Sequence, residues 1–271
     1  AALGLTVKPD QISIEKLEAR SSHYLVRMGL FTMLGIPTAI AVTEHEPAGR
    51  FIPLTRITDS SQLSKFIIDI IPLLHLDPEP AKTLGYIVSE LVRNVIEHAA
   101  APHGAILCAQ YYPKSNAIRI GIADTGVGIR ATINRSYPAK TDLAAIQLAL
   151  TPGITGTTRR EGGTEQNAGA GLFFIKSIAS VNRDFFVVYS GSGMYKLLSK
   201  TTKKMILHAD PFDDRHSKSN DLPYWQGTLV GIDISLDQTA AFTALLDAID
   251  TTYSQAVAER KKSRYRKARF V

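Results

Sequence analysis

The sequence has little cysteine and no long apolar run. Its single cysteine, Cys108, cannot form an internal disulfide, so nothing in the chain requires an oxidising compartment and a cytoplasmic location is expected. A membrane span needs roughly 18 uninterrupted apolar residues. The best candidate, FIIDIIPLLHL, is interrupted by Asp69, Pro72 and His75, so no span is expected. The chain opens AALGL without methionine, which leaves open that an upstream part is missing.

Charge of one sign is in only modest excess. The 31 Lys and Arg residues against 25 Asp and Glu give a net charge of +6, and much of the excess lies in the tail RKKSRYRKARFV at residues 260–271. Such a tail is either a solvated terminus or a patch that attracts nucleic acid or acidic lipid. Apolar residues are plentiful at 45%, and 271 residues of this composition support a sizeable core in one large or two small domains.

The spacing of apolar residues alternates along the chain between the period of a helix and that of a strand. Helical spacing is found in residues 13–34, as one or two short helices, and in DSSQLSKFIIDIIPLL, SELVRNVIEHA, DLAAIQLAL, GLFFIKSIASV and 237–258. Strands are predicted in FIPLTRI, AILCAQYY, AIRIGIAD, DFFVVYS, MYKLLSKTTKKMILHA (two strands around a turn) and GTLVGIDIS. The linker PKSN has turn chemistry and predicts a hairpin between AILCAQYY and AIRIGIAD.

The helix SELVRNVIEHA, residues 89–99, is mostly apolar but carries a narrow polar arc. At about 100° per residue, its polar side chains share an arc of about 100°. These residues are Glu90, Asn94, Glu97 and His98. An ordinary amphipathic helix turns such an arc to water, and a binding helix turns it to a ligand. This helix alone does not separate the two.

Two glycine motifs follow. In IADTGVGI, residues 122–129, Asp124 comes off the end of a strand and precedes Gly126 and Gly128, which permit a tight backbone path near a flat ligand. In NAGAGLFFI, residues 167–175, Gly169 and Gly171 open a helix whose free N–H groups attract phosphate. The alternatives are a simple strand-to-loop turn and a loop that only starts a helix. The segment at residues 125–168, between the two motifs, reads mostly as a long loop. A loop of this length in a compact domain is usually functional or disordered.

The order of these motifs resembles the GHKL ATPase superfamily. Over residues 80–236 the chain has ELxxNxxxH on a helix, a hairpin ending in DxGxGI, a lid, GxGL opening a helix, and a late GT beginning a strand. The resemblance implies the histidine-kinase-like ATPase fold, an α/β (α+β) two-layer sandwich with a mixed, mostly antiparallel sheet and helices on one face. It also implies binding of ATP with Mg²⁺.

The resemblance assigns a role to each motif residue. Asn94 would coordinate Mg²⁺, and Glu90 matches the position that polarises an attacking water or hydroxyl. Asp124 would bind the adenine amino group with support from Thr228. The remaining nucleotide-binding residues, on the base, sugar and phosphate sides, would be Gly126, Gly128, Ile129, Gly169, Gly171 and Leu172.

Three further polar residues have two readings each. His98 matches an NxxxH pattern found in small kinases of this superfamily, and it could instead make only a structural hydrogen bond at the helix end. Arg159 and Arg160 in the lid could reach the γ-phosphate or remain solvated.

Within the superfamily, the chain looks most like regulatory ATP-binding proteins of the anti-sigma-factor kinase kind. Neither His23 nor the loop residue His45 resembles the phospho-accepting histidine of a sensor kinase, and the 35 residues after Leu236 are too few for a transducer domain. The resemblance implies a regulatory protein partner or a homodimer. We expect an N-terminal helical segment at 1–47, which could be the remnant of an upstream domain, an ATP-binding domain at 48–236, and a C-terminal helix with a basic tail at 237–271.

Three functions stay open at this point. As an enzyme, the chain would use Glu90 to transfer the γ-phosphoryl group of ATP to water or to a partner's hydroxyl. As a switch, it would bind ATP only to order the lid and so control a partner. Nucleic-acid binding through the basic tail would show steep dependence on salt.

Overall fold

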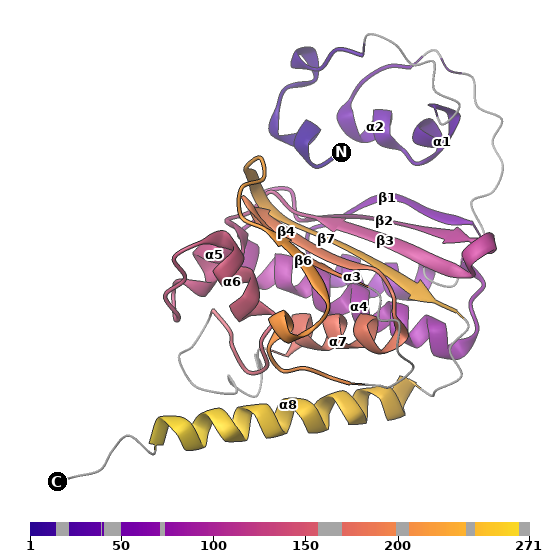
Figure 1. The fold of residues 1–271 in the computed structure, drawn as a ribbon. Coiled ribbons are helices and arrows are strands. Elements are labelled where there is room, and N and C mark those ends of the chain that lie inside the picture. The colour runs from indigo at the N-terminus through magenta and orange to yellow at the C-terminus, as the bar shows by residue number, and fades with distance from the viewer. Residues whose placement is uncertain are drawn as a thin grey trace. The chain divides into compact units, whose positions relative to one another are not determined.

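The computed structural model describes residues 1–14, 22–38, 40, 50–70, 74–156, 170–198, 206–236 and 242–265 (Figure 1). The chain divides into two compact units, Ala1–Gly126 and Val127–Val271. Each unit combines helices with antiparallel strands. The predicted mixed α/β fold with a mostly antiparallel sheet is therefore confirmed. None of the helices in the described ranges is both long and apolar enough to cross a membrane.

The first unit is built on three antiparallel strands in the order β1-β2-β3. The strands are β1 (Phe51–Ile57), β2 (Ala105–Tyr112) and β3 (Ala117–Ala123). Its helices are η1 (Leu3–Thr6), η2 (Pro9–Gln11), α1 (Ser22–Arg27), α2 (Leu30–Leu34), α3 (Ser60–Lys65), η3 (Phe66–Ile70), α4 (Pro78–Asn94), η5 (Val95–Ala99) and η6 (Pro113–Ser115). Figure 1 shows α3 and α4 on the same side of these strands. The predicted hairpin around PKSN is present, with Tyr112 paired to Ala117.

Helix α4 forms because its sequence suits both the start and the buried face of a helix. Pro78 lies in the first turn, where its missing N–H costs nothing. The apolar stripe is buried and consists of Leu84, Ile87, Val88, Leu91 and Val92. After Asn94 the helix continues as the π-helical turn η5 and stops at Ala100, which has φ +48°. The polar arc therefore lies at the end of an anchored helix.

The N-terminal segment packs on the edge of the same three strands. Gly29 and Gly35, with φ of +75° and +67°, lie at the two ends of α2. The Leu54 N–H in β1 donates to the Met28 carbonyl at 2.9 Å. The Tyr24 hydroxyl donates to Gln110 Oε1 in β2 at 2.7 Å. These contacts tie α1 to β1 and β2.

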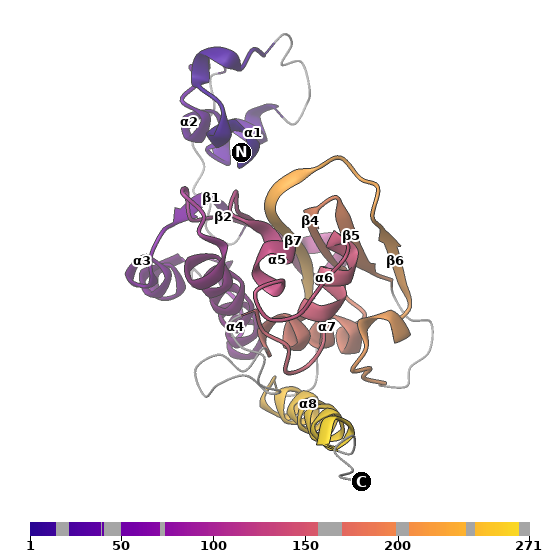
Figure 2. The same cartoon turned by 90° about the vertical axis from the view of Figure 1, so that its left-hand side faces the viewer.

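The second unit has four antiparallel strands in the order β7-β4-β5-β6. They are β4 (Phe186–Gly191), β5 (Gly193–Leu197), β6 (His216–Ser219) and β7 (Trp225–Ser235). Its helices are α5 (Gly128–Ile133), α6 (Asp142–Ala149), α7 (Gly171–Asn182), η7 (Pro211–Asp213) and α8 (Phe242–Tyr265). Helix α7 contacts β7 and α8, and in the rotated view α5 and α6 lie side by side near β4 and β5 (Figure 2).

Three details of the second unit differ from the sequence-based expectation. The second strand predicted within MYKLLSKTTKKMILHA is absent at residues 206–208, and residues 199–205 lie outside the described ranges. The strand beside β5 is β6 instead, because residues 208 and 214 are held against α7 by a buried lysine, Lys176. Helix α5 was not expected, since Gly128 at its start indicates only a turn. Helix α8 extends to Tyr265 rather than ending near residue 258.

Candidate functional site

The polar face of α4 places a half-buried carboxylate beside one arginine. The Glu90 side chain is 26% exposed, and the Arg93 guanidinium lies 3.6 Å from it. Arg93 also reaches Glu97 at 4.0 Å. Burial raises the pKa of Glu90, Arg93 lowers it, and Glu97 raises it again, with a net shift upward. A carboxylate with a raised pKa is a better proton acceptor than a fully solvated one.

Asn94 follows Glu90 by one helical turn and so lies on the same face. It is the last residue of α4 and is partly exposed. The backbone then widens into the π-helical η5, which the sequence does not reveal. His98 lies in this turn, 19% exposed, with Nε2 3.9 Å from the Glu97 carboxylate. π-Helical turns occur frequently at functional sites.

The DTG part of the first glycine motif is folded against the end of that helix. Asp124 is only 2% exposed, and its Oδ1 accepts the Gly126 N–H at 2.7 Å. A Cβ on Gly126 would collide with the Ala99 carbonyl oxygen, so only glycine allows this approach. Thr125 is 7% exposed, and its Oγ1 has no hydrogen-bond partner among the described residues. The first unit therefore brings Asp124 and Gly126 next to the helix that carries Glu90 and Asn94.

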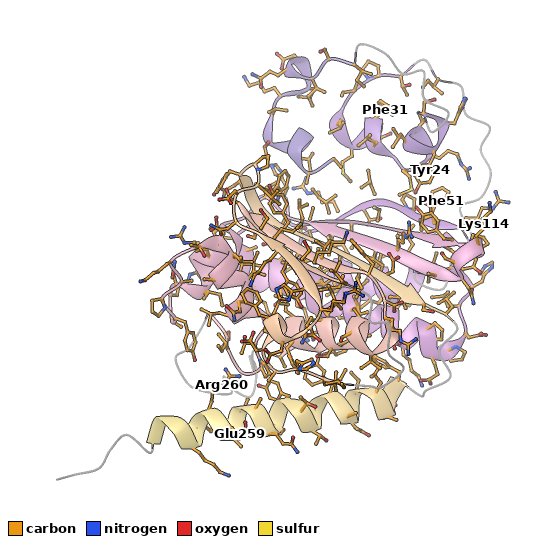
Figure 3. The ribbon with its side chains drawn as sticks, in the orientation of Figure 1. Tyr24, Phe31, Phe51, Lys114, Glu259 and Arg260 are labelled. Carbon is orange, nitrogen blue, oxygen red and sulfur yellow. The ribbon has the colours of Figure 1, made fainter. Side chains whose placement is uncertain are left out.

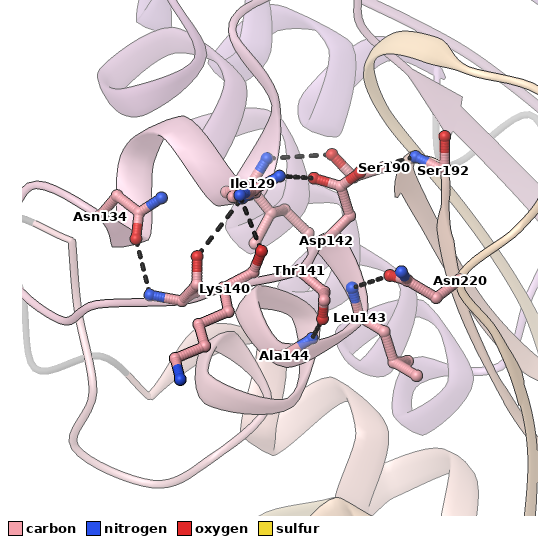
Figure 4. A network of polar contacts seen from close by, with 12 residues as sticks. Ile129, Asn134, Lys140, Thr141, Asp142, Leu143, Ala144, Ser190, Ser192 and Asn220 are labelled. Carbon is pink, nitrogen blue, oxygen red and sulfur yellow. Dashed lines mark hydrogen bonds and ion pairs between the residues drawn. The ribbon is translucent and has the colours of Figure 1, made fainter.

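Within the second unit, the hydroxyl of Ser190 connects the Gly128-Ile129 part of the first glycine motif to the Gly227-Thr228 pair. Gly128 has φ +79° and opens α5. The Ile129 N–H donates to Ser190 Oγ at 2.9 Å, and Ser190 Oγ donates to the Gly227 carbonyl at 2.7 Å. Thr228 follows Gly227 in β7. Two motifs about one hundred residues apart thus meet at Ser190, whose contact with Ile129 is drawn in Figure 4. Sequence reasoning missed Ser190 because a lone strand serine carries no signal.

The expected lid, residues 130–168, is described as far as residue 156, and residues 128–156 form a packed module. Its core cluster consists of Ile133, Ala139, Ala145 and Ile154. The Asp142 carboxylate accepts the Ser192 N–H at 2.9 Å and lies 3.8 Å from the Arg130 guanidinium. The Asn220 side chain accepts the Leu143 N–H at 3.0 Å (Figure 4). Helix α6 is thereby fastened to the β4–β5 turn and to the residue that follows β6.

No side chain in the described part of the chain caps the start of α7. Ala170 occupies the N-cap position, and alanine has no polar atom to offer to the first N–H groups of the helix. Gly171 and Leu172 follow and are partly exposed. Gly169, Arg159 and Arg160 lie outside the described residues. Uncapped N–H groups at a helix start attract anions such as phosphate.

The structure thus groups the predicted residues in three places. Glu90, Asn94, Asp124 and Gly126 lie in the first unit. Gly128, Ile129 and Thr228 meet around Ser190 in the second unit, and Gly171 and Leu172 begin α7. Among the described residues no three His, Cys, Asp or Glu side chains gather into a metal cluster.

The structure combines a buried aspartate turn, a helix-opening glycine and an uncapped helix start with antiparallel strands and helices, which is an arrangement suited to an α/β nucleotide-binding domain. Residues 60–183, which run from α3 through α7, match the family model described as "Histidine kinase-like ATPase domain". This match confirms the superfamily resemblance and supports ATP binding. A search of curated proteins found no match. The narrower resemblance to anti-sigma-factor kinases stays a prediction.

Proposed function

We propose that the chain binds Mg-ATP and transfers the γ-phosphoryl group of ATP to water or to a hydroxyl of a regulatory partner protein. Such a partner is what the resemblance to anti-sigma-factor kinases implies. The observation that supports this most directly is Glu90. Its carboxylate is half-buried, has a raised pKa and lies one turn before Asn94 on the same helix face. A purely solvated polar stripe would not raise the pKa of one of its members by burial.

The base side of the proposed site is formed by Asp124 and its neighbours. The hydrogen bond from Gly126 fixes the orientation of the Asp124 carboxylate, which then accepts from the adenine amino group. The unpartnered Thr125 Oγ1 adds a polar atom beside it. Thr228 supports the adenine contact, and Ser190 holds the strand position next to it. Gly128 and Ile129 lie next to the base and sugar.

The phosphate side uses the α7 start and Asn94. Gly169, Gly171 and Leu172 wrap the phosphates, and the uncapped N–H groups of α7 donate to them. Asn94 suits the metal, because a side-chain amide oxygen is a hard ligand of the kind that Mg²⁺ accepts. The bound Mg²⁺ supplies neutralisation of phosphate charge.

Chemistry at this site needs a base and a nucleophile. Glu90 accepts the proton of a water or of a partner's hydroxyl while the oxygen of that water or hydroxyl bonds to the γ-phosphorus. The bond between the γ-phosphorus and the bridging oxygen breaks, and ADP leaves. The products are ADP with inorganic phosphate, or ADP with a phosphorylated partner.

The test is ATP turnover by the purified chain with Mg²⁺, with and without cell extract as a source of acceptor. Glu90→Gln should abolish phosphate release or protein labelling while ATP binding, measured by calorimetry, stays intact. Glu79→Gln is the matched control, because it removes an exposed carboxylate from the first turn of the same helix. Turnover that survives in Glu90→Gln would refute the catalytic role.

A second candidate function is an ATP-gated switch without chemistry. It is supported by the packed 128–156 module, which Ser190 connects to the GT pair of β7 and so offers a firm surface for a partner protein or a second copy. No turnover by the wild-type chain, together with ATP-dependent protection of residues 128–156 from hydrogen exchange, would favour this function. Nucleic-acid binding through the basic tail would instead appear as affinity that falls steeply with salt.

A further inference from the structure

Helix α8 presents one face to the rest of the second unit. Ile249 is fully buried and Val257 is 7% exposed, while Tyr253 and Arg260 on the same face are partly buried. These positions follow helical spacing, whereas Glu259 is exposed. Figure 3 shows Arg260 on α8, which in Figure 1 runs alongside α7. Two residues of this face, Tyr253 and Arg260, contact two different segments of the second unit.

Tyr253 packs against the first turn of α7. Its ring centroid lies 6.2 Å from that of Phe173 and 6.0 Å from that of Phe174, in tilted geometries. Phe173 is fully buried, and the two phenylalanines are themselves edge to face at 6.0 Å. Gly171 and Leu172 directly precede them in the chain. The Tyr253 ring therefore supports the backbone that opens α7.

Arg260 reaches the other flank of the stretch that leads to α7. Its guanidinium donates to the Pro152 carbonyl. Residues 153–156 are buried. At Gly156 a Cβ would collide with the Thr132 carbonyl, and Ser136 Oγ donates to the Gly156 carbonyl at 2.9 Å. Arg260 thus fixes the start of a tightly packed turn.

The two contacts belong to one cluster. Burial raises the pKa of Tyr253, and the nearby positive charge of Arg260 lowers it. Because Tyr253 and Arg260 stand on one rigid helix, the positions of Pro152 and of the α7 start are linked to each other. Neither the glycine motifs nor the helical spacing of residues 237–258 reveals this link.

We infer that Tyr253 and Arg260 are positioning residues for nucleotide phosphate: α8, which Arg260 ties to Pro152, holds the first turn of α7, whose N–H groups receive the phosphates. This inference rests on the proposed function. It assigns to the C-terminal helix a share in ATP affinity, although none of its residues need touch the nucleotide.

The experiment compares Tyr253→Leu and Arg260→Met with the wild-type chain. ATP and adenosine affinities are measured by competition against a fluorescent ATP analogue, and hydrogen exchange of residues 151–156 and 171–174 is measured without nucleotide. We expect ATP affinity to fall about fivefold or more while adenosine affinity stays unchanged, because adenosine lacks the phosphates that the α7 start receives. Exchange at both segments should accelerate.

Two control variants separate positioning from general damage. Lys261→Met removes an exposed positive charge from the next residue, and Tyr253→Phe keeps the ring, so both should match the wild type. Unchanged ATP affinity in Tyr253→Leu and Arg260→Met would overturn the inference. Equal losses for ATP and adenosine would also overturn it, since they would indicate a general structural effect. A wild-type chain that binds neither ligand would instead refute the proposed function, and the exchange data would still show whether α8 holds the two segments.

Discussion

The Lys176 ammonium lies 2.7 Å from the Asp214 carboxylate, and neither side chain is exposed to solvent. The pair is well satisfied, because Lys176 also donates to the His208 carbonyl at 2.8 Å and Ser180 Oγ donates to Asp214 at 3.3 Å. It joins α7 to the segment that leads into β6. A buried ion pair contributes to stability only while both partners are present.

Removing one partner of this pair should therefore destabilise the chain strongly. Lys176→Met leaves the Asp214 carboxylate buried without its countercharge, and we expect the free energy of unfolding to fall by about 3–5 kcal/mol. Urea denaturation measures this change. Lys218→Met, at an exposed position in β6, is the matched control and should change it by less than about 1 kcal/mol. Similar stabilities for the two variants would contradict this account.

Asp184 should make stability depend on pH near neutrality. Burial, the largest cause, and the nearby Asp233 together raise its pKa to about 7, although the hydrogen bond from the Ser235 N–H opposes them. Between about pH 4 and pH 7 the unfolded carboxyl is ionised and the folded one keeps its proton, so this group's contribution to stability falls as pH rises and levels off above pH 7. Asp184→Asn should flatten that fall and be more stable than the wild type at pH 8. Urea denaturation at pH 5 and pH 8 tests this, and an unchanged difference between the two pH values would refute it.

Gly126 should be required for folding, apart from any contact with a nucleotide. Alanine there would collide with the Ala99 carbonyl, and we expect a loss of about 1–3 kcal/mol or more in the free energy of unfolding without ligand. Gly121→Ala in β3 is the control, because its Cβ would meet only Cys108 Sγ at 4.0 Å. Thermal unfolding of the two variants gives the comparison. A Gly126→Ala chain as stable as Gly121→Ala would show that the motif is conformationally freer than its packing indicates.

The acid limb of ATP turnover should follow the pKa of Glu90. Burial raises that pKa, so the limb should lie at higher pH than for an ordinary glutamate. Arg93→Gln removes a lowering influence and should move the limb to higher pH, whereas Glu97→Gln removes a raising influence and should move it to lower pH. The profile of kcat against pH distinguishes these shifts. Movement of both variants in the same direction would rule out Glu90 as the titrating base.

Local sequence signals predicted the elements whose folding is decided locally. The β2–β3 hairpin follows from alternating apolar residues around PKSN, and α4 follows from its buried stripe. Two of the predicted site residues lie near the end of η5, since Gly126 packs against Ala99 and its N–H donates to Asp124. The roles predicted for the site residues stay proposals.

Features that depend on distant contacts were not predictable. Ser190 becomes informative only when β4 and β7 pair and bring Gly227 to it. The position of β6 depends on Lys176, which in the sequence is one lysine in an apolar helix. The π-helical turn after Asn94 leaves the apolar spacing of the helix nearly unchanged, so periodicity does not detect it.

The turn Pro113–Ser115 between β2 and β3 gives the molecule a convenient point for attaching a probe. All three residues are exposed, and Figure 3 labels Lys114 at this turn. The turn precedes β3, whereas Asp124 follows it at the other end of the strand. Exposed loop tips tolerate added groups better than packed segments do. A dye or affinity tag placed at Lys114 would therefore leave the DTG motif and the polar face of α4 untouched in assays that test whether the proposed partner protein binds.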